Sequence, residues 1–134
     1  MGLFKRKAPK AKILAVDDEP DVLKLLRAML ESEGYEIATA SGGDECLRLA
    51  LEDNPDLIIL DLMMPEMNGA DAARILNSRP ETAKIPIIML TALGEAKYRR
   101  GALFDLGIEY YIVKPFVKRD LLEKIDQALN FERL

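Results

Sequence analysis

Short apolar runs alternate with amphipathic stretches along the chain, and this alternation predicts its secondary structure. Five runs have the length and composition of β-strands. They cover residues 13–16, 36–40, 57–60, 86–90 and 110–113. Four of the five are continuously apolar, which is typical of strands that helices cover on both faces of a parallel sheet.

Between and after these runs, apolar residues recur at the spacing of one helix face. In the first stretch they are Val22, Leu25, Leu26, Met29 and Leu30, with Pro20 suited to a first turn and Gly34 just past the end. Further helices are predicted over residues 43–52, 70–78, 95–106 and 118–129. Five successive βα units predict an α/β fold, a flavodoxin-like, doubly wound parallel sheet with strand order 2-1-3-4-5.

Length and composition limit the chain to one globular domain. Its 134 residues are 49% hydrophobic, enough for one compact core but not for two. Residues 1–12 hold five of the 19 basic side chains and no acid, so the rest sets 14 basic against 23 acidic residues, a net charge of −9. We therefore predict a basic, disordered tail over residues 1–11 and one domain over residues 12–134.

The charge and hydropathy of the chain argue against two kinds of partner. A net negative domain lacks the clustered Lys and Arg that neutralise phosphates, so we expect no direct DNA binding. No apolar run approaches the roughly 20 residues that span a bilayer, and no apolar signal segment follows the first charges, so we predict a cytoplasmic protein without membrane contact. Cys46 is the only cysteine and histidine is absent. An internal disulfide and Cys–His catalysis are thereby excluded.

Polar residues follow the predicted strands at their carboxyl ends, where open parallel sheets bind ligands. Asp17 and Asp18 follow the first strand, and Asp61 follows the third. Thr91 follows the fourth strand and Lys114 the fifth. If the first and third strands are neighbours, as the predicted order requires, three carboxylates converge within a few ångströms.

Three converging carboxylates repel one another, so either one of them binds a proton or a cation lies between them. Oxygen ligands suit Mg²⁺, with Mn²⁺ as an alternative, and Mg²⁺ commonly binds carboxylates together with a phosphate oxygen. A single Asp after a strand is commonly only a helix N-cap or a turn former. The specificity of the signal therefore lies in the combination of five polar residues at one edge of the sheet.

With this combination the chain resembles the receiver domain of response regulators over residues 12–134. The matching stretches are Val16-Asp17-Asp18-Glu19, Asp61-Leu62-Met63-Met64-Pro65-Glu66-Met67-Asn68-Gly69, Thr91-Ala92 and Lys114-Pro115-Phe116. The resemblance implies that Asp61 is the phosphoacceptor. It also implies that Asp17, Asp18, Asp61 and the backbone carbonyl of Met63 hold Mg²⁺.

The other motif residues have roles that chemistry supports. A carboxylate attacks an anionic phosphoryl group only if charge is neutralised, which a metal ion and the Lys114 ammonium would do. The Thr91 hydroxyl would donate to a phosphoryl oxygen, and the small Ala92 beside it leaves an opening for the donor. By resemblance, the bond between Lys114 and Pro115 is a cis peptide, a geometry almost confined to proline.

The resemblance implies a signalling switch that is not an enzyme with an external substrate. Thr91 is expected to move toward the phosphoryl group while Tyr111 turns inward, which changes the face formed by residues 95–106, 110–113 and 118–129. The phosphoryl donor would be a histidine kinase or phosphotransfer protein, since this chain has no histidine. A downstream protein effector would read the change, and the protein would be a monomer or a weak phosphorylation-dependent dimer.

Two other functions share parts of this pattern. A Mg²⁺-dependent phosphatase of the haloacid-dehalogenase type would need a second Asp two residues after Asp61 as general acid and base, and Met63 occupies that position. A flavodoxin-like cofactor binder would need a glycine- or hydroxyl-rich first loop, whereas Asp17, Asp18 and Glu19 repel phosphate unless a metal intervenes. We therefore expect a receiver domain.

Overall fold

The computed structural model describes residues 8–92 and 106–131, and it forms a parallel α/β sheet structure in these ranges. Its elements in chain order are β1 (Lys12–Val16), α1 (Pro20–Glu31), β2 (Glu36–Ala40), α2 (Gly43–Asp53), β3 (Leu57–Asp61), α3 (Gly69–Ser78), β4 (Ile87–Ala92), β5 (Tyr110–Lys114) and α5 (Lys118–Phe131). The helix predicted over residues 95–106 lies outside the described residues except for its last residue.

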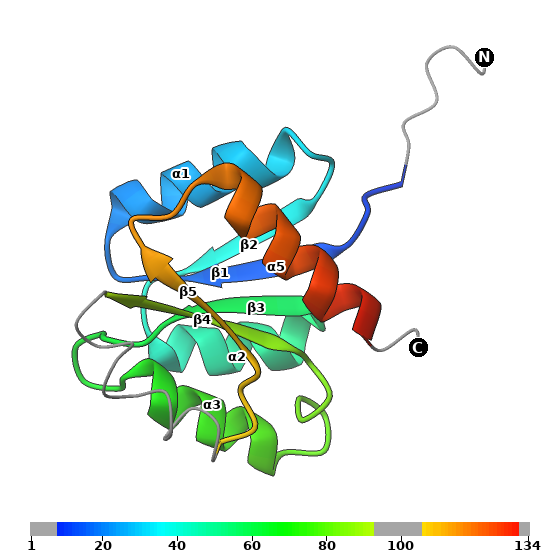
Figure 1. The fold of residues 1–134 in the computed structure, drawn as a ribbon. Coiled ribbons are helices and arrows are strands. Elements are labelled where there is room, and N and C mark those ends of the chain that lie inside the picture. Colours follow the sequence, from blue (N-terminus) through cyan, green and yellow to red (C-terminus); the bar gives the residue numbers. More distant parts are fainter. Residues whose placement is uncertain (1–7, 93–105, 132–134) are drawn as a thin grey trace.

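The five strands form one sheet in the order β2-β1-β3-β4-β5, and all four pairings are parallel. The predicted fold class and strand order are thus confirmed. Figure 1 shows α1 and α5 on one face of the sheet and α2 and α3 on the other. The carboxyl ends of β1 and β3 lie side by side, because Val16 of β1 is in register with Leu60 of β3.

Successive residues of each central strand point to opposite faces, so the sheet divides the interior into two cores. Leu14 and Val16 of β1 pack with residues of α2 and α3. Ile13 and Ala15 of the same strand pack with residues of α1 and α5. Because helices cover both faces, the side chains of β1 and β3 are buried on both sides of the sheet. This explains the continuous apolar runs in the sequence.

Three strands extend further than predicted at the edge where polar residues gather. We expected β3, β4 and β5 to end at apolar residues, but they continue through Asp61, Ala92 and Lys114. The prediction ended each strand at its last apolar side chain, whereas the ladder is formed by backbone groups and does not depend on side-chain polarity. Asp61, Thr91 and Lys114 are therefore strand residues in regular backbone geometry.

Two residues of the predicted tail contact the domain. The Lys10 amide donates to the Gly34 carbonyl at 3.0 Å, and its ammonium lies 5.4 Å from the centre of the Tyr35 ring. The Ala11 carbonyl accepts a hydrogen bond from Glu36. In the part of the chain that the structure describes, no helix is both long enough and apolar enough to cross a membrane.

Candidate functional site

Asp61 is the last residue of β3, the central strand, and its position explains its burial. Its Cα is in register with Leu90 of β4, and the next residue, Leu62, donates its amide to the Leu90 carbonyl at 2.9 Å. Strands β1 and β4 flank β3, and the residue is only 4% exposed. A carboxylate at this position lies at the carboxyl edge of the sheet and is almost fully buried there.

The Lys114 ammonium bridges two buried carboxylates from different strands. Its Nζ lies 2.8 Å from Asp17 Oδ2 and 3.4 Å from Asp61 Oδ1. Asp17 directly follows β1 and is fully buried, and its other oxygen accepts a hydrogen bond from the Glu19 amide at 2.9 Å. The bond between Lys114 and Pro115 is cis, the geometry that the sequence resemblance implied. These contacts join residues up to 97 positions apart in the sequence.

The surroundings of this bridge make ionisation of Asp61 less favourable than it is for an aspartate in water. Burial and the nearby Asp17 carboxylate raise the pKa of Asp61 to about 6, although Lys114 and the Met63 amide act in the opposite direction. Burial alone would lower the pKa of Lys114, but its hydrogen bond to Asp17 and the two carboxylates outweigh burial, so the pKa is raised. One ammonium therefore only partly compensates two buried carboxylates, and the site retains an affinity for added positive charge.

A cluster of carboxylates beside this bridge could bind such a charge. Side-chain oxygens of Asp17, Asp18 and Glu19 all lie within 4.8 Å of one another, with Asp17 buried and the other two exposed. The sequence prediction assigned no ligand role to Glu19, although three acids in a row was the signal for it. The set contains only oxygen donors, which fits Mg²⁺ or a similar hard cation.

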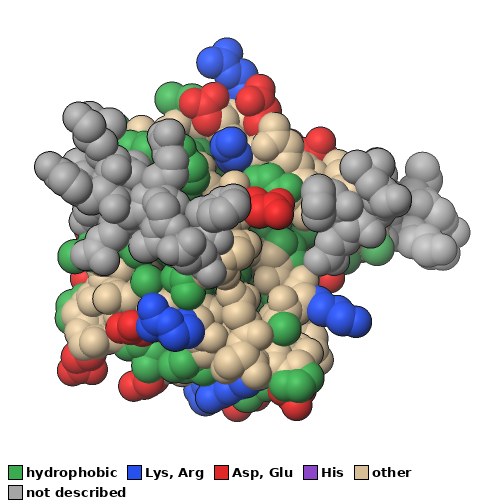
Figure 2. Space-filling view, turned by 60° about the horizontal axis from the view of Figure 1, so that its bottom comes forward, with side chains coloured by type: hydrophobic (Ala, Val, Ile, Leu, Met, Phe, Trp, Pro, Cys, Tyr) green, Lys and Arg blue, Asp and Glu red, His purple; other side chains and the backbone are tan. Residues whose placement is uncertain are grey.

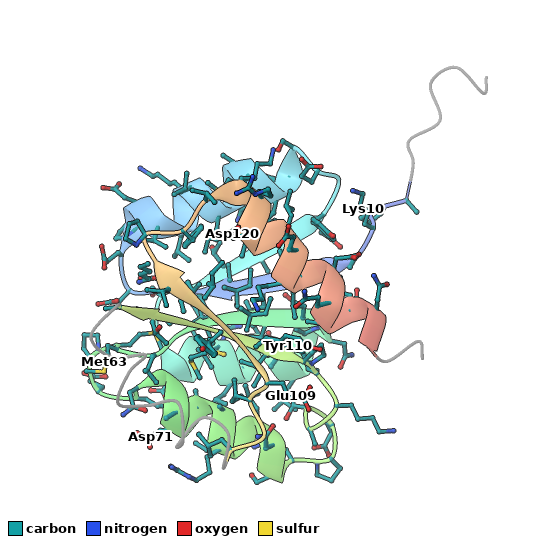
Figure 3. All side chains as sticks on the ribbon, in the orientation of Figure 1. Lys10, Met63, Asp71, Glu109, Tyr110 and Asp120 are labelled. Carbon is teal, nitrogen blue, oxygen red and sulfur yellow. The ribbon has the colours of Figure 1, made fainter. Side chains whose placement is uncertain are left out.

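The segment after Asp61, residues 62–68, is a closed loop that we call the β3–α3 loop. The Gly69 amide donates to the Leu62 carbonyl at 2.7 Å, and a side chain on Gly69 would collide with the Asp61 carbonyl. The Asn68 side chain caps α3 by accepting from the Asp71 amide at 2.8 Å. Met63 is 48% exposed and lies near the carboxyl ends of the strands, opposite the end where Lys10 leaves the sheet (Figure 3).

Thr91 is completely buried near the end of β4, and its hydroxyl oxygen makes no hydrogen bond with any residue that the structure describes. Buried hydroxyl groups normally have a partner, and leaving one without costs roughly 1–3 kcal/mol. A free buried hydroxyl fits a site that accepts an oxyanion.

The two other residues predicted near Thr91 differ in burial. Ala92 is exposed and its Cα is in register with Lys114. Tyr111 is partly buried and packs against the core that the sheet forms with α2 and α3.

We expect Thr91→Val to leave the free energy of unfolding unchanged or to raise it by about 1 kcal/mol, because it removes an unsatisfied buried hydroxyl. Thr82→Val is the matched control. The Thr82 hydroxyl is equally buried but donates to the Leu76 carbonyl at 2.7 Å, so its loss should cost about 1 kcal/mol. Urea unfolding of both variants measures the difference. Equal destabilisation by the two substitutions would contradict the assignment of a free hydroxyl.

A family model described as response regulator receiver domain matches residues 13–126. The chain therefore belongs to the response regulator receiver family. Receiver domains of this family accept a phosphoryl group on an aspartate within two-component systems and generally bind Mg²⁺ in an acidic pocket. The predicted family and general function are thus confirmed, and the phosphatase and the flavodoxin-like cofactor binder are set aside.

Relatives of known name and structure agree. The transcriptional regulatory protein ResD of Bacillus subtilis is 45% identical over 121 residues, 90% of this chain and 49% of ResD. A putative response regulator of Chloroflexus aurantiacus has a TM-score of 0.84 at 32% identity, covering 90% of this chain and 98% of that one. The receiver domain of the sensor histidine kinase PA1611 of Pseudomonas aeruginosa, with magnesium in its active-site cleft, has a TM-score of 0.81 at 28% identity over 90% and 98% of the two chains.

The curated relatives change the expectation about DNA. The chain spans about half the length of ResD and of the phosphate regulon regulator PhoB of Rhizobium meliloti, and both are named transcriptional regulatory proteins. The net negative charge that argued against DNA contact was counted over this chain, which corresponds to only about half of each relative. These relatives therefore do not support the expectation of no DNA binding. On the face in Figure 2, the coloured Lys and Arg side chains stand apart from one another among acidic and apolar ones.

Proposed function

We propose that Asp61 is the residue of this receiver domain that accepts the phosphoryl group. The observation that carries the proposal is the Lys114 bridge: Asp61 and Asp17 are both buried, and one ammonium lies within 3.4 Å of each. The raised pKa of Asp61, about 6, means that its negative charge does not stabilise the folded state. At neutral pH the carboxylate is nevertheless ionised and can act as a nucleophile. It lies at the carboxyl end of β3, the edge of the sheet where ligands of such folds bind.

In the proposed reaction an Asp61 oxygen attacks the phosphorus of a phosphohistidine on a partner protein. The O–P bond forms as the P–N bond breaks, and the imidazole leaves with the bond electrons and takes up a proton from solvent. The Lys114 ammonium offsets negative charge on the phosphoryl oxygens, and the Thr91 hydroxyl donates to one of them. Ala92 leaves the approach open. The same groups would assist hydrolysis of the acyl phosphate, so the protein would catalyse only its own modification and its reversal.

Asp17, Asp18, Asp61 and the backbone carbonyl of Met63 are the proposed ligands of Mg²⁺, and Mn²⁺ would fit the same oxygens. The buried Asp17, the exposed Asp18 and the incomplete charge compensation around Lys114 support this set. A bound divalent ion would supply neutralising charge for the phosphoryl group. Glu19 belongs to the same carboxylate cluster and would add to its negative potential.

We further propose how the modification is read. Thr91 would move toward the phosphoryl group and Tyr111 would turn inward, which would alter the surface of β5, α5 and residues 95–106 for a downstream protein. A histidine kinase or phosphotransfer protein would be the donor, with residues 12–134 as receiver domain and residues 1–11 as a basic tail. The receiver would be monomeric or form a weak dimer when phosphorylated, and it would act in the cytoplasm.

The proposal predicts a defined mass change. Incubated with Mg²⁺ and acetyl phosphate, the protein should gain the mass of one phosphoryl group, measured by intact mass spectrometry. Asp61→Asn should abolish the gain because an amide is not a nucleophile toward phosphorus. Asp71→Asn, at a half-exposed acid of α3 that pairs with Arg74, is the matched control and should leave the gain intact. A gain that persists in Asp61→Asn would reject Asp61 as the acceptor.

A further inference from the structure

A close contact joins the first turn of α2 to the β3–α3 loop. Gly43 is buried at the start of α2, and a methyl group on it would lie 2.6 Å from Met67 Sδ and 2.8 Å from Met67 Cβ and Cγ. Carbon atoms that merely touch are about 3.5–4 Å apart. The Met67 side chain therefore lies directly against the backbone of α2, in space that only glycine leaves free.

This contact fixes the outer half of the β3–α3 loop. At the base of the loop the Gly69 amide is hydrogen bonded to Leu62, and Met64 is 8% exposed in the core beneath. Between these points Glu66 is exposed with a φ of +66°, a conformation that few side chains adopt. Met67 is the next residue along, and its contact with Gly43 adds an attachment of the loop to α2.

The same contact lies near one of the proposed metal ligands, Asp18. Gly43, Met67 and Asp18 line one hollow of about 280 Å³, so the start of α2, the β3–α3 loop and the acidic segment after β1 meet there. Met63, whose carbonyl is a proposed ligand, lies four residues before Met67 in the same loop. A displacement of Met67 would therefore shift the loop that contains Met63, next to the hollow that Asp18 lines.

We propose that Gly43 is a positioning residue for the metal site. By leaving room for Met67 against α2, it holds the β3–α3 loop where the Met63 carbonyl and the carboxylates of Asp18 and Asp61 can bind one divalent ion. The inference deepens the proposed function and rests on it. It also gives a reason for glycine in a helical turn, where glycine is otherwise unfavourable relative to alanine.

The test compares two adjacent glycines. Gly43→Ala should weaken Mg²⁺ binding roughly tenfold, the size of effect seen when groups that orient metal ligands are changed. Gly42→Ala is the matched control, because a methyl group at position 42 has no neighbour within 4 Å, and it should keep the wild-type affinity. Isothermal titration calorimetry gives the dissociation constants. At saturating Mg²⁺ the phosphorylation rate of Gly43→Ala with acetyl phosphate should return to near the wild-type value.

A second substitution separates positioning from packing. Met67→Ala removes two of the three atoms that a methyl group at position 43 would meet and leaves only Cβ at 2.8 Å, so in that background Gly43→Ala should weaken Mg²⁺ binding less than it does with Met67 present. Wild-type affinity in Gly43→Ala, with only its urea midpoint lowered, would overturn the inference and leave the proposed function intact. Absence of Mg²⁺ binding and of phosphorylation in the wild-type protein would overturn both.

Discussion

Asp61→Asn should raise the free energy of unfolding of the Mg²⁺-free protein by about 3 kcal/mol at pH 7.5. The pKa of Asp61 is about 6, compared with an ordinary value of 3.8. Each pKa unit corresponds to about 1.4 kcal/mol, so keeping this buried carboxylate ionised costs the folded state about 3 kcal/mol. Asparagine has nearly the same shape and no charge. The acceptor that the function requires is therefore a group that weakens the fold.

The pH dependence of this difference has a defined sign. Because the pKa of Asp61 is raised in the folded state, its protonated form contributes stability that is fully present below pH 3.8 and is lost as pH rises through about 6. The gap between Asp61→Asn and wild type should consequently widen with pH, by about 1.4 kcal/mol between pH 5 and pH 7.5, and then remain constant. Urea unfolding of both proteins at several pH values measures it.

Two controls accompany this experiment. Glu123→Gln removes an exposed acid of α5 and should change the free energy of unfolding by less than about 0.5 kcal/mol at either pH. Mg²⁺ should stabilise the wild-type protein and narrow its gap to Asp61→Asn, because an ion that binds only the folded form adds to its stability. A gap that narrows as pH rises, or a destabilised Asp61→Asn, would show that the carboxylate is not strained by burial and Asp17.

The arrangement of the strands could be predicted because it depends on patterns that the sequence carries directly. Continuous apolar runs identify strands covered on both faces, and the parallel order places the end of β1 beside the end of β3. That juxtaposition predicts that Asp17 lies near Asp61. Lys114 joined them because β5 ends at the same edge.

Distances within the site could not be predicted in the same way. Strand order does not determine that Lys114 lies closer to Asp17 than to Asp61, since side-chain conformation and burial decide between the two carboxylates. The unpaired Thr91 hydroxyl and the contact between Gly43 and Met67 depend on packing between elements distant in sequence. Such contacts leave no periodic signal, so residue type and spacing carry no information about them.

Lys114→Met should affect phosphorylation and metal binding in opposite directions. The ammonium lies 2.8 Å from Asp17 and 3.4 Å from Asp61, so in the Mg²⁺-free protein it interacts with the carboxylates proposed to bind the metal ion. Replacing it with an apolar side chain of similar length removes a competing positive charge. We therefore expect Mg²⁺ to bind about tenfold more tightly, a change of about 1.4 kcal/mol in binding free energy.

The phosphorylation rate with acetyl phosphate at saturating Mg²⁺ should fall by about a hundredfold or more in the same variant. A fixed charge that offsets developing negative charge in a buried site is typically worth two to three powers of ten in rate. Lys118→Met is the matched control. The Lys118 ammonium pairs with Glu33 at 3.1 Å and makes no ion pair with Asp17 or Asp61, so this substitution should change neither quantity. If Lys114 served only to hold the fold together, both quantities would fall together. Tighter Mg²⁺ binding combined with slower phosphorylation requires that its charge acts on the phosphoryl group.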